Sequence, residues 1–130
     1  MKSVFSKIID REIPSFIVAE NDFAIAFMDI NPIAKGHVLV VPKKQVDYLF
    51  DLDDDSYHKL WDFVKLVSSG IKKTIHCNRV GVSVVGLEVP HAHVHLIPIN
   101  SVSDMSFSNK VDMSSEEIER ISVDISNTLV

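Results

Sequence analysis

The amino-acid sequence predicts an α+β protein in which helices pack against an antiparallel sheet of about five strands. Apolar stretches of strand length occur between residues 16 and 42 and again between residues 79 and 98. The intervening segment 60–71 instead repeats its apolar residues every three to four positions, which is typical of an amphipathic helix. A polar turn at residues 20–22 joins two of the strands, as in an antiparallel hairpin.

The first 45 residues predict a short helix followed by three strands. The helix is indicated by apolar residues at helical spacing, namely Val4, Phe5, Ile8 and Ile9. It is expected to end before Ile13-Pro14, because a residue that precedes proline disfavours the helical conformation. The strands are expected at residues 16–19, 23–28 and 36–42. The third of them is almost continuously apolar, which predicts a central position in the sheet.

Beyond residue 45 the pattern predicts a short helix, a long helix, two strands and a closing helix. The short helix is expected at residues 46–50, and the long one has its apolar stripe at Leu60, Phe63 or Val64, Val67 and Ile71. The aspartates at 51 and 53–55 precede the long helix, and capping of its amino terminus explains them better than a metal site. The remaining elements are strands at 79–85 and 91–98, a surface connection at 100–114 and a helix at 115–129 that begins with the capping box of Ser114 and Glu117.

Length and composition predict a single domain over residues 1–130. Hydrophobic residues make up 46% of the chain and charged residues 24%, as in an ordinary globular protein. The modest net charge of −5 argues against a nucleic-acid partner and against an anionic membrane surface. The single cysteine rules out an internal disulfide, and no apolar run reaches membrane-spanning length. These features predict a cytoplasmic protein.

The segment from Glu88 to Pro98 contains three histidines that alternate with small or apolar residues. In an extended strand His91, His93 and His95 would share one face, and the alternate residues would face the core. Three imidazoles in a row are a costly structural device, because each buried ring nitrogen needs a hydrogen-bond partner. The pattern therefore predicts a chemical site. It is either a nucleophilic histidine with supporting imidazoles or a zinc site with Glu88 or His37 as a further ligand.

The stretch His91-Ala92-His93-Val94-His95-Leu96-Ile97-Pro98 resembles the signature of the histidine triad family. Further segments resemble the same family, namely Ser6–Ser15, Phe27–Pro32 and Gly36–Lys43. The resemblance implies the histidine-triad fold and hydrolysis or transfer of nucleoside monophosphates at phosphorus, without a metal cofactor. It implies that His93 attacks phosphorus and forms a covalent nucleotidyl-histidine. His91 and His95 would place donors around the phosphate, and His37 resembles the fourth histidine of the family's site.

The resemblance also implies a binding site for a purine nucleotide. Asp29 corresponds to the carboxylate that accepts hydrogen bonds from the ribose hydroxyls. The other expected nucleotide contacts are Phe5, Ile8, Phe27, Ile30, Leu39, Glu88 and Val89.

The chain departs from the family pattern at three places that bear on function. Leu87 stands where many relatives have a glutamine that could contact the phosphate or the leaving group. The turn before Gly86 is shorter than in many relatives, and Ser83 is the candidate substitute for the asparagine or glutamine that they carry there. Ser3, Ser6 and Gln45 stand where bacterial relatives often hold a structural zinc through cysteine and histidine. Because hydroxyl and amide groups are poor zinc ligands, we expect no structural zinc.

The intact His95 and the amino-terminal segment resemble the nucleoside phosphoramidase branch of the family. The leading interpretation is therefore a hydrolase of purine nucleoside 5′-phosphoramidates or related nucleotide conjugates. The alternatives are a dinucleoside polyphosphate hydrolase, a nucleotide-binding protein with little turnover, and the zinc site on the histidine strand. The resemblance also implies a homodimer, for which the apolar residues of the long helix are a candidate interface.

Overall fold

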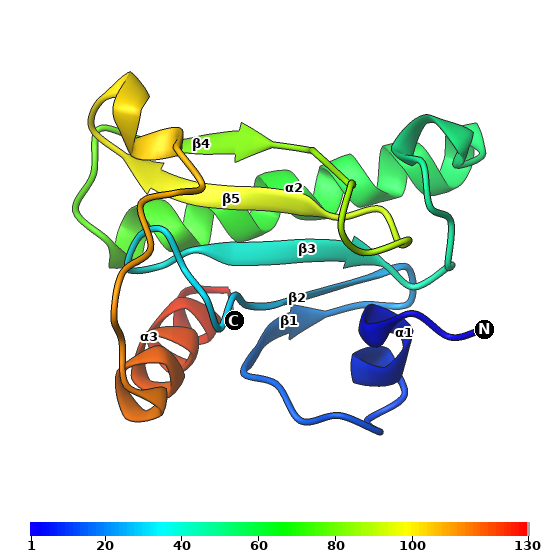
Figure 1. Cartoon of the computed structure of the whole chain (residues 1–130), viewed down its shortest axis with the longest axis horizontal. Coiled ribbons are helices and arrows are strands. Elements are labelled where there is room, and N and C mark those ends of the chain that lie inside the picture. Colours follow the sequence, from blue (N-terminus) through cyan, green and yellow to red (C-terminus); the bar gives the residue numbers. More distant parts are fainter. Residues whose placement is uncertain (130) are drawn as a thin grey trace.

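The computed structural model describes residues 1–129 and confirms the predicted α+β class (Figure 1). All neighbouring strands pair antiparallel, in the order β1-β2-β3-β5-β4. The central position of β3 is thereby confirmed. The strands are β1 (Ile17–Glu20), β2 (Ala24–Met28), β3 (Val38–Pro42), β4 (Arg79–Ser83) and β5 (Val94–Ile99). The α-helices are α1 (Val4–Ile9), α2 (Asp54–Thr74) and α3 (Ser115–Thr128).

The sheet has two apolar faces with different coverings. Successive residues of β2 point to opposite faces, so that Ala26 belongs to one hydrophobic cluster and Phe27 to the other. The larger cluster lies under α2 and α3, whereas the smaller one contains Phe5 and Ile8 of α1 (Figure 1). Because the short α1 covers only part of its face, the rest of that face remains open for a binding site.

The two long helices follow the predicted capping and apolar patterns. The Asp53 side chain caps α2 by accepting a hydrogen bond from the backbone N–H of Ser56, which confirms the capping interpretation of the acidic run. Ser114 and Glu117 form the expected capping box at the start of α3. The buried apolar stripes are Leu60, Phe63, Val64, Val67 and Ile71 on α2 and Ile118, Ile121 and Ile125 on α3.

The histidine segment is only partly a strand, which corrects the predicted strand at 91–98. The last pair between β4 and β5 is Ser83 with His95, so β4 ends at Ser83 rather than at residue 85. Residues 84–93 form the connection between these strands, and Gly86 permits its turn with a φ of +71°. His91 and His93 therefore lie in the approach to β5, where their backbone is free to bond outside the sheet ladder.

Two other segments also differ from the prediction. The expected helix at 46–50 is a single 3₁₀ turn, Leu49–Asp51. The connection at 100–114 contains a 3₁₀ turn of its own, Val102–Met105, and the N–H of Val111 donates to the carbonyl of Pro32 at 2.9 Å. The predicted domain 1–130 includes Val130, which lies outside the described residues. Among residues 1–129, no helix combines the length and the apolarity needed to cross a membrane.

Candidate active site

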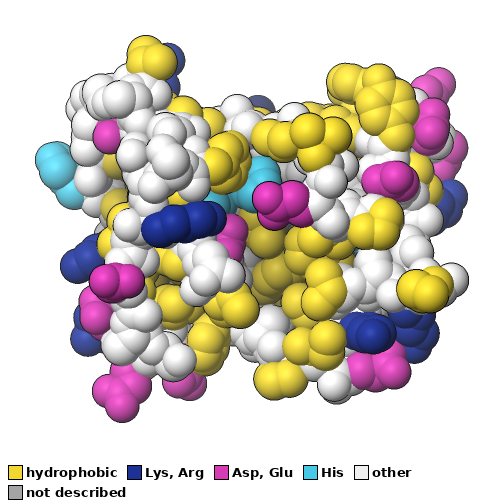
Figure 2. Space-filling view, viewed as in Figure 1, with side chains coloured by type: hydrophobic (Ala, Val, Ile, Leu, Met, Phe, Trp, Pro, Cys, Tyr) yellow, Lys and Arg dark blue, Asp and Glu magenta, His cyan; other side chains and the backbone are white. Residues whose placement is uncertain are grey.

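A cavity of about 560 Å³ opens on the face of the sheet that α1 partly covers. Figure 2 shows this face, where a hollow floored mainly by hydrophobic side chains lies beside histidine and acidic side chains. The cavity brings together α1, the ends of β2 and β3, the connection 84–93 and the segment after β5. It therefore has an apolar wall and a polar end.

The cavity contains most of the residues that the sequence singled out. His93 and His95 line its polar end, and all eight expected nucleotide contacts line it as well. These eight are Phe5, Ile8, Phe27, Asp29, Ile30, Leu39, Glu88 and Val89. His37 and His91 have fully buried side chains and are not among the lining residues in the described part of the chain.

A backbone contact defines which nitrogen of the His93 ring carries a proton. Its Nδ1 lies 2.8 Å from the carbonyl oxygen of His91, and because a carbonyl only accepts, Nδ1 carries the proton and donates. The other ring nitrogen, Nε2, therefore has a free lone pair in the neutral imidazole. The Phe5 ring packs edge-on against this imidazole with centroids 4.9 Å apart. His93 is thus an oriented ring that offers a nucleophilic nitrogen to the cavity.

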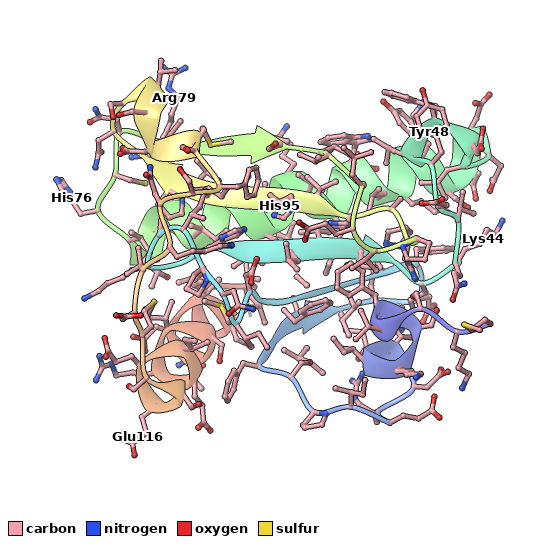
Figure 3. All side chains as sticks on the ribbon, in the orientation of Figure 1. Lys44, Tyr48, His76, Arg79, His95 and Glu116 are labelled. Atoms are coloured by element: carbon pink, nitrogen blue, oxygen red, sulfur yellow. The ribbon has the colours of Figure 1, made fainter. Side chains whose placement is uncertain are left out.

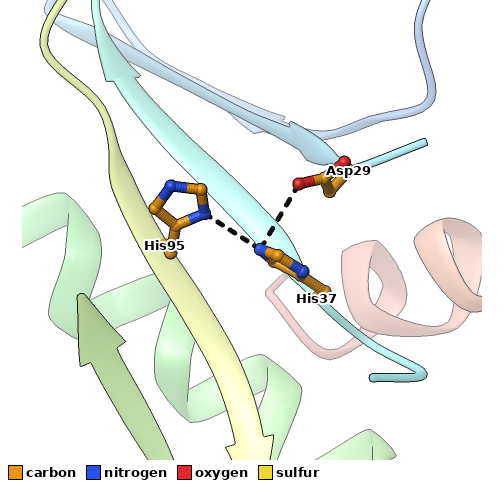
Figure 4. A group of neighbouring side chains, drawn as sticks. All are labelled: Asp29, His37 and His95. Atoms are coloured by element: carbon orange, nitrogen blue, oxygen red, sulfur yellow. Dashed lines mark hydrogen bonds and ion pairs between the residues drawn. The ribbon is translucent and has the colours of Figure 1, made fainter. Parts of the chain in front are cut away.

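His95, which projects from β5 (Figure 3), belongs to a chain of hydrogen bonds that leads to buried His37 (Figure 4). The N–H of Ile33 donates to Nδ1 of His37 at 3.1 Å, so the proton of His37 sits on Nε2. His37 Nε2 then donates to His95 Nδ1 at 3.0 Å. The proton of neutral His95 must therefore be on Nε2, where it is available as a donor at the polar end of the cavity.

Burial keeps this imidazole pair neutral. It lowers the pKa of His37 to about 4 and the pKa of His95 to about 4, because a charged ring would lose its hydration. The Asp29 carboxylate, with Oδ2 at 3.5 Å from His37 Nε2, acts in the opposite direction on the pKa of His37. Near neutral pH both rings are therefore uncharged, and their proton positions follow from the hydrogen bonds alone.

Asp29, His37 and His95 also meet the distance condition for a metal site, with one ligand atom each within 4.8 Å of the others. The hydrogen bonds argue against this use. A metal on His37 Nε2 would displace its proton, while Nδ1 already accepts from Ile33. Metal-bound histidines normally carry a proton on the other nitrogen and donate it. The arrangement therefore favours a chain of hydrogen bonds from Ile33 through His37 to His95 over a metal centre.

His91 uses both ring nitrogens away from the cavity, which differs from its expected role as a phosphate donor. Nε2 donates to the carbonyl of Pro42 at 2.7 Å, and Nδ1 accepts from the Ser3 hydroxyl at 2.7 Å. The backbone carbonyl of His91 meanwhile accepts from His93. His91 thus orients its neighbour His93 instead of contacting a substrate.

The positions that resemble a zinc site hold a network of neutral groups. The Ser6 hydroxyl donates to Oε1 of Gln45 at 2.6 Å, and the N–H of Ser3 donates to the same oxygen at 2.8 Å. Ser3 Oγ also caps α1 by accepting from the N–H of Ser6 at 2.9 Å. Hydroxyl and amide oxygens are poor zinc ligands, so the residues present do not fit a structural zinc. The network instead links α1 to His91.

We expect Ser3→Ala to reduce catalysis as well as stability. The variant loses the α1 cap, at a cost of about 1 kcal/mol, and removes the 2.7 Å donor to Nδ1 of buried His91, which then has only the Ser6 hydroxyl at 3.4 Å. The expected reduction in kcat is about fivefold to tenfold, with Ser3→Thr restoring most of it. Ser114→Ala is the matched control, because Ser114 caps α3 and its recorded hydrogen bonds go to Glu117 and not to a histidine. Unfolding by denaturant and steady-state kinetics distinguish the two effects, and equal kcat values for the two alanine variants would contradict the link.

Among the cavity residues that were not predicted from the sequence, two come from the segment after β5. Phe107 and Lys110 line the cavity, although both lie in the segment 100–114 that was expected to be only a surface connection. Neither belongs to a periodic pattern or motif, so no local signal distinguishes them from solvent-exposed residues. Leu87 lies at the rim with 87% of its surface exposed, and Ser83 pairs with His95 across the sheet.

Comparison with known proteins agrees with this geometry. Residues 10–102 match the family model described as HIT domain. The chain is 33% identical over 132 residues to an uncharacterized HIT-like protein of Borreliella burgdorferi, which covers 95% of each chain. It is 33% identical over 106 residues to the purine nucleoside phosphoramidase of Escherichia coli K12, which covers 74% of this chain and 86% of that one.

A solved structure extends the likeness over nearly the whole fold. The HIT-like protein involved in cell-cycle regulation from Bartonella henselae matches with a TM-score of 0.86 and 32% identity. The match covers 98% of this chain and 96% of that one. The family model, the curated relatives and the shared fold together show that this chain belongs to the HIT, or histidine triad, family.

Proposed function

We propose that the protein hydrolyses purine nucleoside 5′-phosphoramidates or related nucleotide conjugates through a covalent nucleotidyl adduct on His93. One observation carries the proposal: Nε2 of His93 has a free lone pair at the same end of the cavity where His95 offers an N–H. Displacement at phosphorus requires a nucleophile and, beside it, a hydrogen-bond donor for the charge on the phosphoryl oxygens. The relative from Escherichia coli K12, named a purine nucleoside phosphoramidase, supports the choice of substrate.

The remaining cavity residues suit a nucleotide. Phe27, Leu39 and Val89 provide an apolar wall for a flat base. The Asp29 side chain is 18% exposed, and its Oδ1 accepts from the N–H of Asn31 at 2.8 Å. This bond holds the carboxylate at the polar side of the cavity, where it accepts hydrogen bonds from the ribose hydroxyls in the proposed complex. The phosphate of such a nucleotide then lies at His93 and His95.

In the proposed reaction the lone pair of His93 Nε2 forms a bond to phosphorus while the bond from phosphorus to the leaving nitrogen breaks. The negative charge on the phosphoryl oxygens is met by the N–H of His95. In the second step water bonds to phosphorus, and the bond to His93 Nε2 breaks. The proton that water releases balances the proton that the departing amine takes up, so the cycle ends with a nucleoside monophosphate, an amine and free His93.

The test is turnover of adenosine 5′-phosphoramidate, followed by chromatographic detection of adenosine monophosphate and by assay of released ammonia. Guanosine and cytidine phosphoramidates measure base preference, and diadenosine tetraphosphate tests the dinucleotide alternative. Release of both products in equal amounts from purine substrates is expected. Tight calorimetric binding of adenosine monophosphate without turnover of any substrate would contradict the enzyme proposal and favour a nucleotide-binding protein.

We also propose that two chains form a homodimer through the β4 edge of the sheet. β4 lies at the end of the strand order, and Val82, Val84 and Val85 on and after it are 39–50% exposed. An exposed apolar edge strand is suited to isologous pairing. The stripe of α2 residues that seemed a candidate interface is instead buried under the sheet.

The dimer proposal predicts that Val82→Glu converts the protein to a monomer, because paired copies would bury the new charges against each other. The control is Val123→Glu on α3, since Val82 and Val123 are both 49% exposed. Sedimentation velocity measures the outcome. A wild-type protein that is already monomeric at micromolar concentration would overturn the proposal.

A further inference from the structure

The segment that follows β5 forms one wall of the candidate active site. It runs along the end of the sheet that lies away from α1 (Figure 1), and it contributes Phe107 and Lys110 to the lining of the cavity. Two contacts hold it there: Val111 N–H donates to the Pro32 carbonyl at 2.9 Å, and Lys110 Nζ donates to the Asn31 carbonyl at 3.2 Å. Both residues lie beyond residue 102, where the match to the family model ends. This wall is therefore an addition to the part of the chain that the family model describes.

Phe107 places the wall directly beside the polar end of the cavity. Its ring lies edge-on to His95 with centroids 4.8 Å apart and at 6.4 Å from the ring of His37. An aromatic ring at these distances packs against the imidazole pair and limits the access of water to it. Phe107 therefore lies beside His95, and the same segment carries Lys110, whose Nζ lies at the Asn31 carbonyl on the cavity wall.

Lys110 brings a positive charge to this end without an ionic partner. It is the one Lys or Arg among the described residues that line the cavity. Among residues 1–129, no carboxylate oxygen lies within 4.0 Å of the Lys110 Nζ. Its charge nevertheless reaches the site, because it contributes to the low pKa of His37 and of His95. The connection 84–93 contributes no cation to the lining: Val85 and Leu87 offer apolar surface, and Glu88 offers a carboxylate.

The cation suits the part of a substrate that no other residue serves. In the proposed complex the base lies on the apolar wall, the ribose at Asp29 and the phosphate at His93 and His95. What remains is the leaving group, which must lie opposite His93 for an in-line displacement and so extends toward the open mouth. A neutral leaving group such as ammonia has no use for a cation there.

We propose that Lys110 is a specificity-determining residue that binds an anionic group on the leaving group of the substrate. The preferred substrates are then nucleotide conjugates whose leaving group carries a carboxylate or a phosphate, such as an amino acid joined through its nitrogen or a second nucleotide. The inference rests on the proposed function of the same site. Lys110 would make a charge-assisted hydrogen bond that neutral leaving groups lack.

The sharpest test compares two substrates that differ in one charge. Adenosine 5′-phosphoryl-N-glycine and its glycinamide analogue share the same scissile bond, but only the first carries a carboxylate. We expect wild-type kcat/KM to favour the glycine conjugate by about tenfold. Lys110→Gln should bring this ratio close to one, and Lys110→Arg should retain it. Lys73→Gln, which removes an exposed lysine of α2 outside the cavity, is the matched control and should keep the wild-type ratio.

Each other outcome has a defined meaning. A ratio that Lys110→Gln leaves unchanged overturns the proposal, and so does an equal loss with both conjugates, which would assign Lys110 to the nucleotide itself. Diadenosine tetraphosphate distinguishes a phosphate-bearing leaving group from a carboxylate-bearing one. If the wild type hydrolyses none of these compounds, the proposed function fails. In that case the role of Lys110 is still tested by calorimetry. The affinities of the glycine and glycinamide conjugates compare binding of a carboxylate with binding of an amide.

Discussion

Replacement of His93 by alanine is expected to lower kcat/KM for adenosine 5′-phosphoramidate by about 10³-fold or more. Nδ1 of this ring is held by the carbonyl of His91 at 2.8 Å, which leaves Nε2 as the nucleophile. Alanine has no lone pair to form the bond to phosphorus, so the two-step route is closed. The His93 side chain is only 6% exposed, so His93→Gln is a useful second variant that keeps more of the packing.

Intact-protein mass spectrometry after rapid acid quenching measures the intermediate itself. The wild type should gain the mass of one adenylyl group, and both His93 variants should not. His76→Ala is the matched control, since His76 is exposed and lies far from His95 (Figure 3). An adduct of the same mass on His93→Ala would show that another residue is the nucleophile. Unchanged thermal unfolding of the variants confirms that the loss concerns chemistry.

Replacement of His95 by alanine is expected to lower kcat by about 10²- to 10³-fold. Its Nε2 proton, required by the bond from His37 to His95 Nδ1 at 3.0 Å, is the donor for charge that develops on the phosphoryl group. His95→Gln should recover part of the loss, because an amide N–H also donates. Single-turnover kinetics with adenosine 5′-phosphoramidate measure the effect on adduct formation and on its hydrolysis separately.

Kinetics of the same His95 variants, with and without a chelator, distinguish a hydrogen-bond donor role of His95 from a role as metal ligand. If Asp29, His37 and His95 held a catalytic metal, a chelator would abolish wild-type activity, and His95→Gln would not exceed His95→Ala. If His95 acts as a hydrogen-bond donor, the wild type keeps full activity in the chelator. The activity then falls in the order wild type, His95→Gln, His95→Ala. His95→Ala activity within a few-fold of the wild type would refute the donor role.

Much of the fold was predictable because periodicity reports burial directly. The continuous apolar run of β3 indicated a strand covered on both faces, and the spacing on α2 indicated which side chains face the sheet. The ends of the histidine strand were not predictable. They depend on the register of β5 against its two neighbours, where Ser83 opposite His95 and Val40 opposite Val94 are the last pairs. Register is a relation between two segments and leaves no mark in either one alone.

By itself, the sequence predicted part of the candidate site: the alternating histidines indicated His93 and His95, and the resemblance to the histidine triad family implied Asp29 and an apolar wall. Only the tertiary structure decided what each imidazole does. The proton positions of His91, His37 and His95 depend on Ser3, Pro42 and Ile33. Lys110 likewise reaches the cavity only because its segment folds back on Asn31 and Pro32. A hydrogen bond between distant residues is a property of their positions in space, and no local pattern of residue types encodes it.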